Sequence, residues 1–212
     1  MIYARFGLFL FGLLVFSFGI TVTIKMQHLG IHPWDVLNVG LYNIFGLSIG
    51  SWNIIIGMIL IAIALILDRS YVKLGTIINV IFIGAFVDFF LWLDFLPGKT
   101  NIVFDFIMIM TGVVIMGIGG GLYNAARLGA GPRDGFMLSI SDKTGASIGK
   151  VRIITETSVL VLGLLIGGPV FIVTFIFTFV QSPIFQYVYV KGDTLMNNLE
   201  RKVVERRQHS IS

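Results

Sequence analysis

The sequence of 212 residues contains no cysteine and few charged residues. The missing cysteine excludes disulfide bonds, thiolate metal sites and a cysteine nucleophile. Asp, Glu, Lys and Arg together supply 12% of the residues, about half of their share in a soluble domain. Because 56% of the residues are hydrophobic and the mean hydropathy is +0.94, we expect lipid rather than water around most of the chain.

Several functional motifs are also missing from the sequence. There is no Walker loop, so an ATP-driven pump is not expected. The three histidines form no metal-ligand pattern, and we expect no metal, no cofactor and no enzymatic activity. The formal net charge of +4 does not indicate nucleic-acid binding, because most charges lie in short loops and the tail. No cleavable signal is expected, since the first apolar run is long and no small-x-small site follows it.

Six apolar runs approach the length of about 20 residues that a membrane helix requires. They are Phe6–Ile24, Gly50–Leu67, Leu74–Leu93, Phe106–Ala126, Ile153–Gly168 and Pro169–Val190. Two further runs, Trp34–Leu47 and Arg133–Ser141, are too short to span a bilayer. Each follows a proline, which suits the first turn of a helix, so we expect two short or half helices.

The chain contains an internal repeat with an offset of 99 residues. In this register, Leu29–Gly50 matches Leu128–Gly149 at eight of 22 positions without a gap. The shared residues form Leu-Gly-x-x-Pro-x-Asp and Gly-x-Ser-Ile-Gly motifs. Internal duplication is typical of many transporter folds. We therefore expect a first membrane repeat over residues 1–98, a second over 99–190, and a basic tail over 191–212.

The positions of the basic residues indicate how the two repeats are oriented. If six runs cross the membrane and the N-terminus lies in the cytoplasm, all but Lys25 and Lys99 of the 15 Lys and Arg residues are cytoplasmic. If the short runs also crossed the membrane, more of the Lys and Arg residues would lie outside the cytoplasm. The positive-inside rule therefore predicts an all-α bundle with six long spans, two short helices and a two-fold inverted repeat. Both termini are then cytoplasmic.

The tail has two interpretations. Leu195, Leu199 and Val203 follow at helical spacing, which fits a short helix on the inner leaflet. A solvated tail that fixes the topology fits the composition equally well.

The Leu-Gly-x-x-Pro-x-Asp segments are the main candidate for a binding site. If both short helices begin inside the membrane, their N-termini carry partial positive charge toward a shared centre and suit an anionic group. His32, Asp35 and Asn38 would line the outer approach, and Arg133 and Asp134 the inner one. The alternative is structural, because an acid near the third helical position also complements the helix dipole. Both roles can coexist.

Other polar residues within the apolar runs are candidates for the same site. Asp88 lies deep in its run and is the best single candidate for a proton- or cation-coupled group. Asn124 fits a cavity wall or an interhelical hydrogen bond. Glu156 lies four residues after Arg152, so the two side chains are expected to pair along one helix face.

Two sequence patterns are better explained by structure than by chemistry. The repeated Gly-x-Ser-x-Gly resembles a hydrolase elbow, but no strand or His–acid partner accompanies it. We therefore expect Ser48 and Ser147 to be helix N-caps. Gly117 and Gly121 have the spacing of a close-packing helix face, with an unwound point as the alternative.

The length, the duplicated motifs and the basic tail resemble the YczE/YyaS/YitT group of bacterial integral membrane proteins, nearest its YczE-like branch. The resemblance covers nearly the whole chain. It implies a bacterial plasma membrane and assigns no catalytic or binding residue.

The residues leave two functions open. The first is a small secondary transporter or exporter of a metabolite or organic anion, with its site between the short helices. The second is a non-transporting accessory protein that acts on a cytoplasmic partner such as a biosynthetic enzyme. The lipid bilayer is the expected surrounding in both cases. A homodimer is an open expectation without a defined interface.

Overall fold

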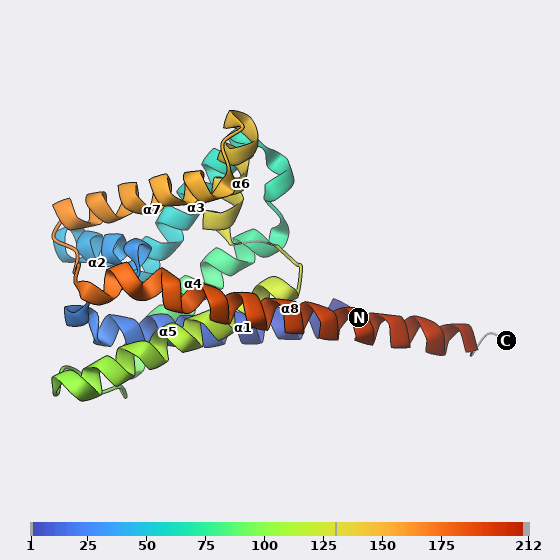
Figure 1. The fold of residues 1–212 in the computed structure, drawn as a ribbon, viewed down its shortest axis with the longest axis horizontal. Coiled ribbons are helices and arrows are strands. Elements are labelled where there is room, and N and C mark those ends of the chain that lie inside the picture. The colour runs from blue at the N-terminus through green and yellow to red at the C-terminus, as the bar shows by residue number, and fades with distance from the viewer. Residues whose placement is uncertain (1, 130, 210–212) are drawn as a thin grey trace.

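The computed structural model describes residues 2–129 and 131–209, and no strand occurs in this part of the chain. Figure 1 shows the helices in chain order. Their bounds are α1 Ile2–Lys25, α2 Pro33–Phe45, α3 Ile49–Leu67, α4 Leu74–Leu93, α5 Ile102–Ala125, α6 Pro132–Thr144, α7 Ile148–Leu165 and α8 Ile172–His209, with 3-10 turns η1 Gln27–Leu29 and η2 Arg69–Tyr71. The expected all-α fold is confirmed.

Five helices are long and apolar enough to cross a membrane, namely α1, α3, α4, α5 and α8. The remaining long helix, α7, has 18 residues and carries Lys150, Arg152 and Glu156 near its start. Because of these charges, the composition of α7 is not apolar enough to count it among the membrane-crossing helices. The count of six spans therefore stays a prediction.

The two short helices form where the sequence predicts them. Both α2 and α6 contain 13 residues and begin with a proline at their first position. At 1.5 Å per residue each is about 20 Å long, which is too short to span a bilayer. Each ends at a glycine with positive φ, Gly46 and Gly145. Left-handed backbone at a helix end favours glycine, so these residues fix where the short helices stop.

The helices that follow begin with the expected serine caps. Ser48 Oγ accepts a hydrogen bond from Ser51 N–H at 3.0 Å, and Ser147 Oγ accepts one from Lys150 N–H at 3.4 Å. The N-cap prediction for both serines is confirmed.

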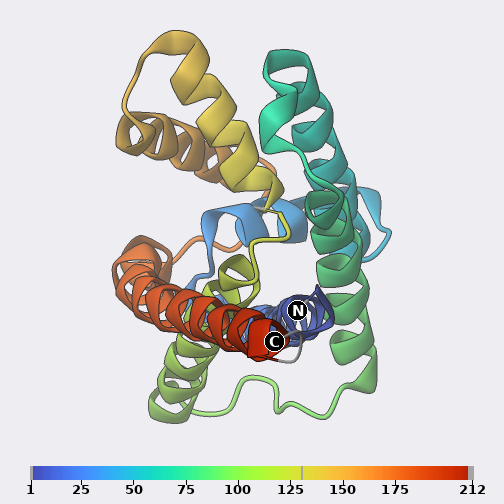
Figure 2. The ribbon, with the colours of Figure 1, turned by 90° about the vertical axis from the view of Figure 1, so that its right-hand side faces the viewer.

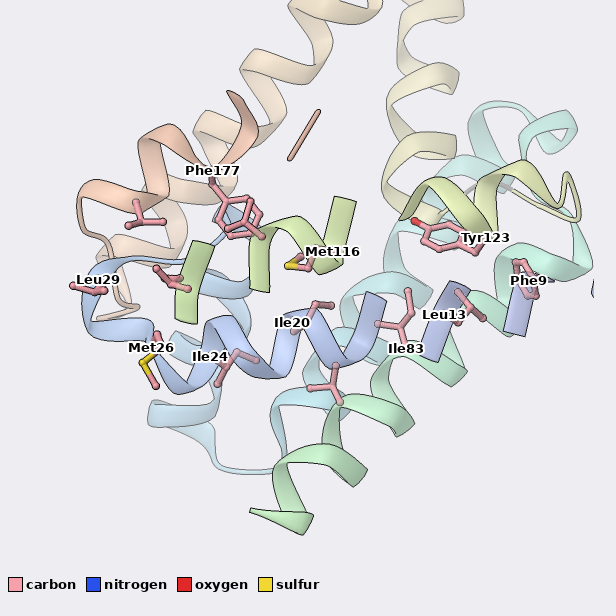
Figure 3. Close-up of a cluster of buried hydrophobic side chains, with 14 of the residues drawn as sticks. Phe9, Leu13, Ile20, Ile24, Met26, Leu29, Ile83, Met116, Tyr123 and Phe177 are labelled. Carbon is pink, nitrogen blue, oxygen red and sulfur yellow. The ribbon is translucent and has the colours of Figure 1, made fainter. Parts of the chain in front are cut away.

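The core lies between α1 and α5, which run in opposite directions (Figure 1). Glycines allow the close crossing, because a Cβ on Gly119 would lie 2.3 Å from Phe16 N. Figure 3 shows the surrounding cluster of buried side chains, including Phe9, Leu13 and Met116. The core therefore joins a helix from the first half of the chain to one from the second half.

The predicted close-packing glycines lie on the opposite face of α5, against α8. A Cβ on Gly117 would approach the Ile184 side chain at 2.8 Å, and one on Gly121 would approach Val188 at 2.7 Å. Since α5 is a continuous helix through both positions, packing rather than unwinding explains them.

Further packing links the two halves of the chain. The short helix α2 packs on α7, and the short helix α6 packs on α3. Within each half, the first helix packs on the fourth, α1 on α4 and α5 on α8. At the end where α1 begins, η2 is joined to α6 by a hydrogen bond from the Tyr71 hydroxyl to the Asp142 carboxylate. This bond raises the pKa of Tyr71.

The basic tail is the continuation of α8 rather than a separate short helix. This helix has 38 residues, so it is about 57 Å long, and Figure 1 shows it extending beyond the bundle. Ion pairs hold it to the bundle, Arg5 to Glu200 at 2.8 Å and Arg127 to Asp193 at 2.6 Å. The side chain of Val203, the third member of the expected apolar stripe, and residues 210–212 lie outside the described part.

Candidate functional site

A cavity of about 370 Å³ lies where the first turns of the two short helices meet. His32 and Trp34 reach it from the start of α2, and residues 131–134 reach it from the start of α6. Side chains of α3, α5, α7 and α8 complete its wall. The fold thus brings the two copies of the Pro-x-Asp segment to one place.

Arg133 is the central charged group of this cavity. Its guanidinium lies over the Trp34 ring, 5.0 Å from the centroid, and donates to Asn53 Oδ1 at 3.2 Å. The Asp35 carboxylate lies 3.9 Å away. A guanidinium has five N–H donors in a planar fork suited to a carboxylate. Arg133 therefore joins both short helices and retains donors for a bound anion.

Asp35 and Asn38 lie behind Arg133 and are fully enclosed. Their exposed fractions are 1% and 2%. Asp35 Oδ2 and Asn38 Oδ1 are buried without a hydrogen-bond partner among the described residues. Burying such oxygens is costly unless a partner compensates them. Neither residue lines the cavity, and Asp35 faces the Arg133 guanidinium that does.

His32 helps to order the α2 end of the cavity. Its Nδ1 accepts a hydrogen bond from Trp34 N–H at 3.4 Å, so the side chain caps α2. Its ring meets Phe177 of α8 edge-on, with centroids 5.1 Å apart. His32 thus connects the start of α2 to α8.

A second cavity of about 480 Å³ continues from the first toward the end where α1 begins and α8 ends. The two cavities share five lining residues, Asp134, Met137, Arg152, Phe185 and Gln186. Arg152 pairs with Asp134 at 3.1 Å at this junction. The expected pairing of Arg152 with Glu156 is thereby replaced by a bond to the short helix α6. Lys73 and Arg127 line the far part.

The last helix contributes a polar face to the first cavity. Thr178, Gln181, Ser182 and Gln186 line it from α8. Counted from Thr178, the other three follow after three, four and eight residues, which places all of them on one side of a helix.

The structure gathers most of the predicted site residues, although not all of them. His32, Arg133, Asp134 and Glu156 line the first cavity. Asn124 lies in the second, where its amide donates to Gly120 O at 3.0 Å.

Asp88 does not reach either cavity. Its carboxylate accepts hydrogen bonds from the Ser48 hydroxyl and from Gly50 N–H, the latter at 2.8 Å. Asp88 therefore caps the N-terminus of α3 from the neighbouring helix α4. Within the described helix α4, no residue pairs with the Asp88 side chain, but the tertiary fold supplies partners from the start of α3.

Sequence reasoning missed Trp34 and the polar face of α8. Trp34 is only 3% exposed and stacks on Arg133. The polar side chains in the last apolar run, at helical spacing, were the available signal for α8. Within the described residues, no group of three or more His, Asp or Glu side chains is arranged to hold a metal ion.

These features define an integral membrane protein of helical type. The chain belongs to the family of unknown function DUF6198, whose model matches residues 3–190. The "uncharacterized membrane protein YczE" of Bacillus subtilis strain 168 is 35% identical over 193 residues, covering 91% of this chain and 89% of the relative. YyaS of the same organism is 32% identical over 173 residues, covering 80% and 83%.

An "uncharacterized protein" of Haemophilus influenzae is 34% identical over 179 residues, covering 82% of this chain and 78% of the relative. The resemblance to the YczE/YyaS group is therefore confirmed. No solved structure matches the chain. The names of these relatives assign no activity.

Proposed function

We propose that this protein is a small secondary transporter or exporter of an organic anion or similar metabolite, and not an enzyme. One observation carries the proposal. The first turns of both short helices and Arg133 converge on a single cavity. Helix N-termini carry partial positive charge, and discontinuous helices that meet near a membrane centre are a recurrent way to bind anionic substrates.

The size and polarity of the cavity support a small substrate. Its 370 Å³ lies near the lower end of the range of about 300–1,000 Å³ for small-molecule sites. Asp35 and Asn53 make only two contacts with the five-donor guanidinium of Arg133. A substrate carboxylate would therefore meet donors already held in place.

The proposal includes six spans, an inverted repeat and cytoplasmic termini in a bacterial plasma membrane. The antiparallel course of α1 and α5 supports inversion (Figure 1). The swapped pairs α2–α7 and α3–α6 support it as well, since an inverted repeat exchanges equivalent helices. Arg5, Lys73 and Arg127 gather at the end where α1 begins, as the positive-inside rule requires of the cytoplasmic side.

The test is uptake by proteoliposomes that contain the purified full chain. Radiolabelled lactate, succinate and glutamate are offered in counterflow against protein-free liposomes. We expect uptake of at least one, and its loss in Arg133→Gln. Lys99→Gln, which removes an exposed charge far from the cavity lining, should transport normally. No uptake of any probe by folded protein, together with no thermal stabilisation by any of them, would overturn the proposal.

A second function is favoured by the length of α8. This helix carries basic residues well beyond the bundle, where a cytoplasmic partner could bind it without any transport (Figure 1). Deleting Asn197–Ser212 separates the two functions. Loss of the cellular phenotype with intact uptake supports the accessory function, and an unchanged phenotype removes its main support.

A further inference from the structure

The wall of the central cavity is incomplete on one side, between α7 and α8. These two helices make no extended contact within the described residues, and α8 packs mainly on α5. Figure 2 shows α6 and α7 standing apart from α8. The cavity occupies this space, because Arg152 and Glu156 of α7 line it together with residues of α8.

The side chains that line the cavity near this opening are polar, whereas those on the surface around it are apolar. Ser182 and Gln186 of α8 are exposed although they line the cavity. Nearby side chains outside the cavity, Ile153 of α7 and Phe179 of α8, are exposed by 68% and 80% and are apolar. Polar groups on a lipid-facing helix are costly unless they face water, protein or a ligand. A charged interior thus meets an apolar rim.

We propose that the cavity opens sideways into the bilayer between α7 and α8, and that its substrate is an anionic amphiphile. The headgroup binds at Arg133, and the apolar tail leaves between α7 and α8 to remain in lipid. This inference rests on the proposed transport function and names its substrate class. Glu156 on the same wall favours a headgroup that carries an N–H donor beside its carboxylate.

The binding test compares two probes with one headgroup, N-dodecanoylglycine and N-acetylglycine. The protein is placed in lipid nanodiscs as the Trp52→Phe, Trp92→Phe variant, so that Trp34 is the sole tryptophan. Since Trp34 stacks on Arg133, its fluorescence reports occupancy. A tail concentrates its headgroup at the membrane, so we expect binding of the dodecanoyl probe at a concentration at least about tenfold lower. Arg133→Gln should abolish both responses, and Lys99→Gln should preserve them.

Two results of the binding test overturn the inference. If only N-acetylglycine binds, the cavity is sealed from lipid, and the transport proposal survives. If neither probe changes Trp34 fluorescence, the proposed substrate class of anionic amphiphiles is wrong. Transport itself is then still decided by the counterflow of lactate, succinate and glutamate.

The opening itself is tested without any ligand. Because the chain lacks cysteine, Ser182→Cys and Phe179→Cys each accept a single nitroxide spin label. Molecular oxygen concentrates in lipid, so its collisions with the label, measured by electron paramagnetic resonance, report lipid contact. We expect high oxygen accessibility at both positions. High oxygen accessibility at residue 179 together with low oxygen accessibility at residue 182 would overturn the lateral opening. The same result is expected if a second copy of the chain covers the gap, and it overturns the lateral opening in that case too.

Discussion

The third and fourth helices of the two halves are arranged differently. In the first half, α3 and α4 pack closely, whereas α7 and α8 in the second half stand apart and flank the cavity. Glycines make the first contact possible. A Cβ on Gly50 would lie 2.1 Å from Gly84 O, and one on Gly57 would lie 2.7 Å from Val80.

The residues 99 positions later account for the difference. Gly57 corresponds to Glu156, and Gly84 corresponds to Pro183. A carboxylate and a proline ring cannot form the same close helix contact. Side-chain size and charge at two positions thus convert a packed interface in one half into a polar opening in the other. The first half therefore contributes a closely packed helix pair, whereas the second half leaves the cavity open on one side.

The largest expected effect tests the charged centre that links the halves. Arg133→Met leaves the Asp35 carboxylate, 1% exposed, without its cation. Removing one partner of a buried pair costs about 3 kcal/mol or more, so we expect a loss of this size in the free energy of unfolding. Denaturation in detergent, followed by circular dichroism, measures it.

A double-mutant cycle provides the control for Arg133. In an Asp35→Asn background, Arg133→Met should cost much less, because no buried charge is left unpaired. Arg152→Met breaks a pair whose side chains are 46% and 37% exposed, and should cost at most about 1 kcal/mol. An equal cost of Arg133→Met in both backgrounds would show that Asp35 is not its partner.

The next effect tests the packed interface against the open one. Gly50→Ala places a methyl group against the Gly84 carbonyl, and overpacking of this kind costs about 1–3 kcal/mol. Gly149→Ala is the matched control, since a Cβ there meets nothing within 4 Å. Alanine favours helix over glycine, so the control should be neutral or stabilising by up to about 1 kcal/mol. Equal destabilisation of both variants in thermal unfolding would contradict the asymmetry.

The helix boundaries were largely predictable from the sequence, whereas the lining of the cavity was predictable only in part. Proline, serine and glycine act through local backbone geometry, so Pro33, Pro132, Ser48 and Ser147 predicted helix starts correctly. The two Pro-x-Asp segments were expected to approach a shared centre if both short helices begin inside the membrane. His32, Arg133, Asp134 and Glu156 line one cavity.

Pairings that depend on tertiary packing were not predictable. Asp88 is bound by Ser48, 40 residues away in sequence, and Arg152 pairs with Asp134 instead of Glu156. Trp34 belongs to an arginine contact that only the meeting of α2 and α6 creates. Spacing along one helix carries no information about such partners, whereas helix ends are determined within a few residues.

The smallest expected effect compares the two serine caps. Ser48 is partly buried, accepts from Ser51 N–H at 3.0 Å and donates to Asp88, whereas Ser147 is exposed and accepts from Lys150 N–H at a longer 3.4 Å. Loss of a cap costs about 0.5–2 kcal/mol. We expect Ser48→Ala near the upper end and Ser147→Ala near the lower end in chemical denaturation. A reversed order would show that partial burial and the bond to Asp88 do not strengthen the first cap.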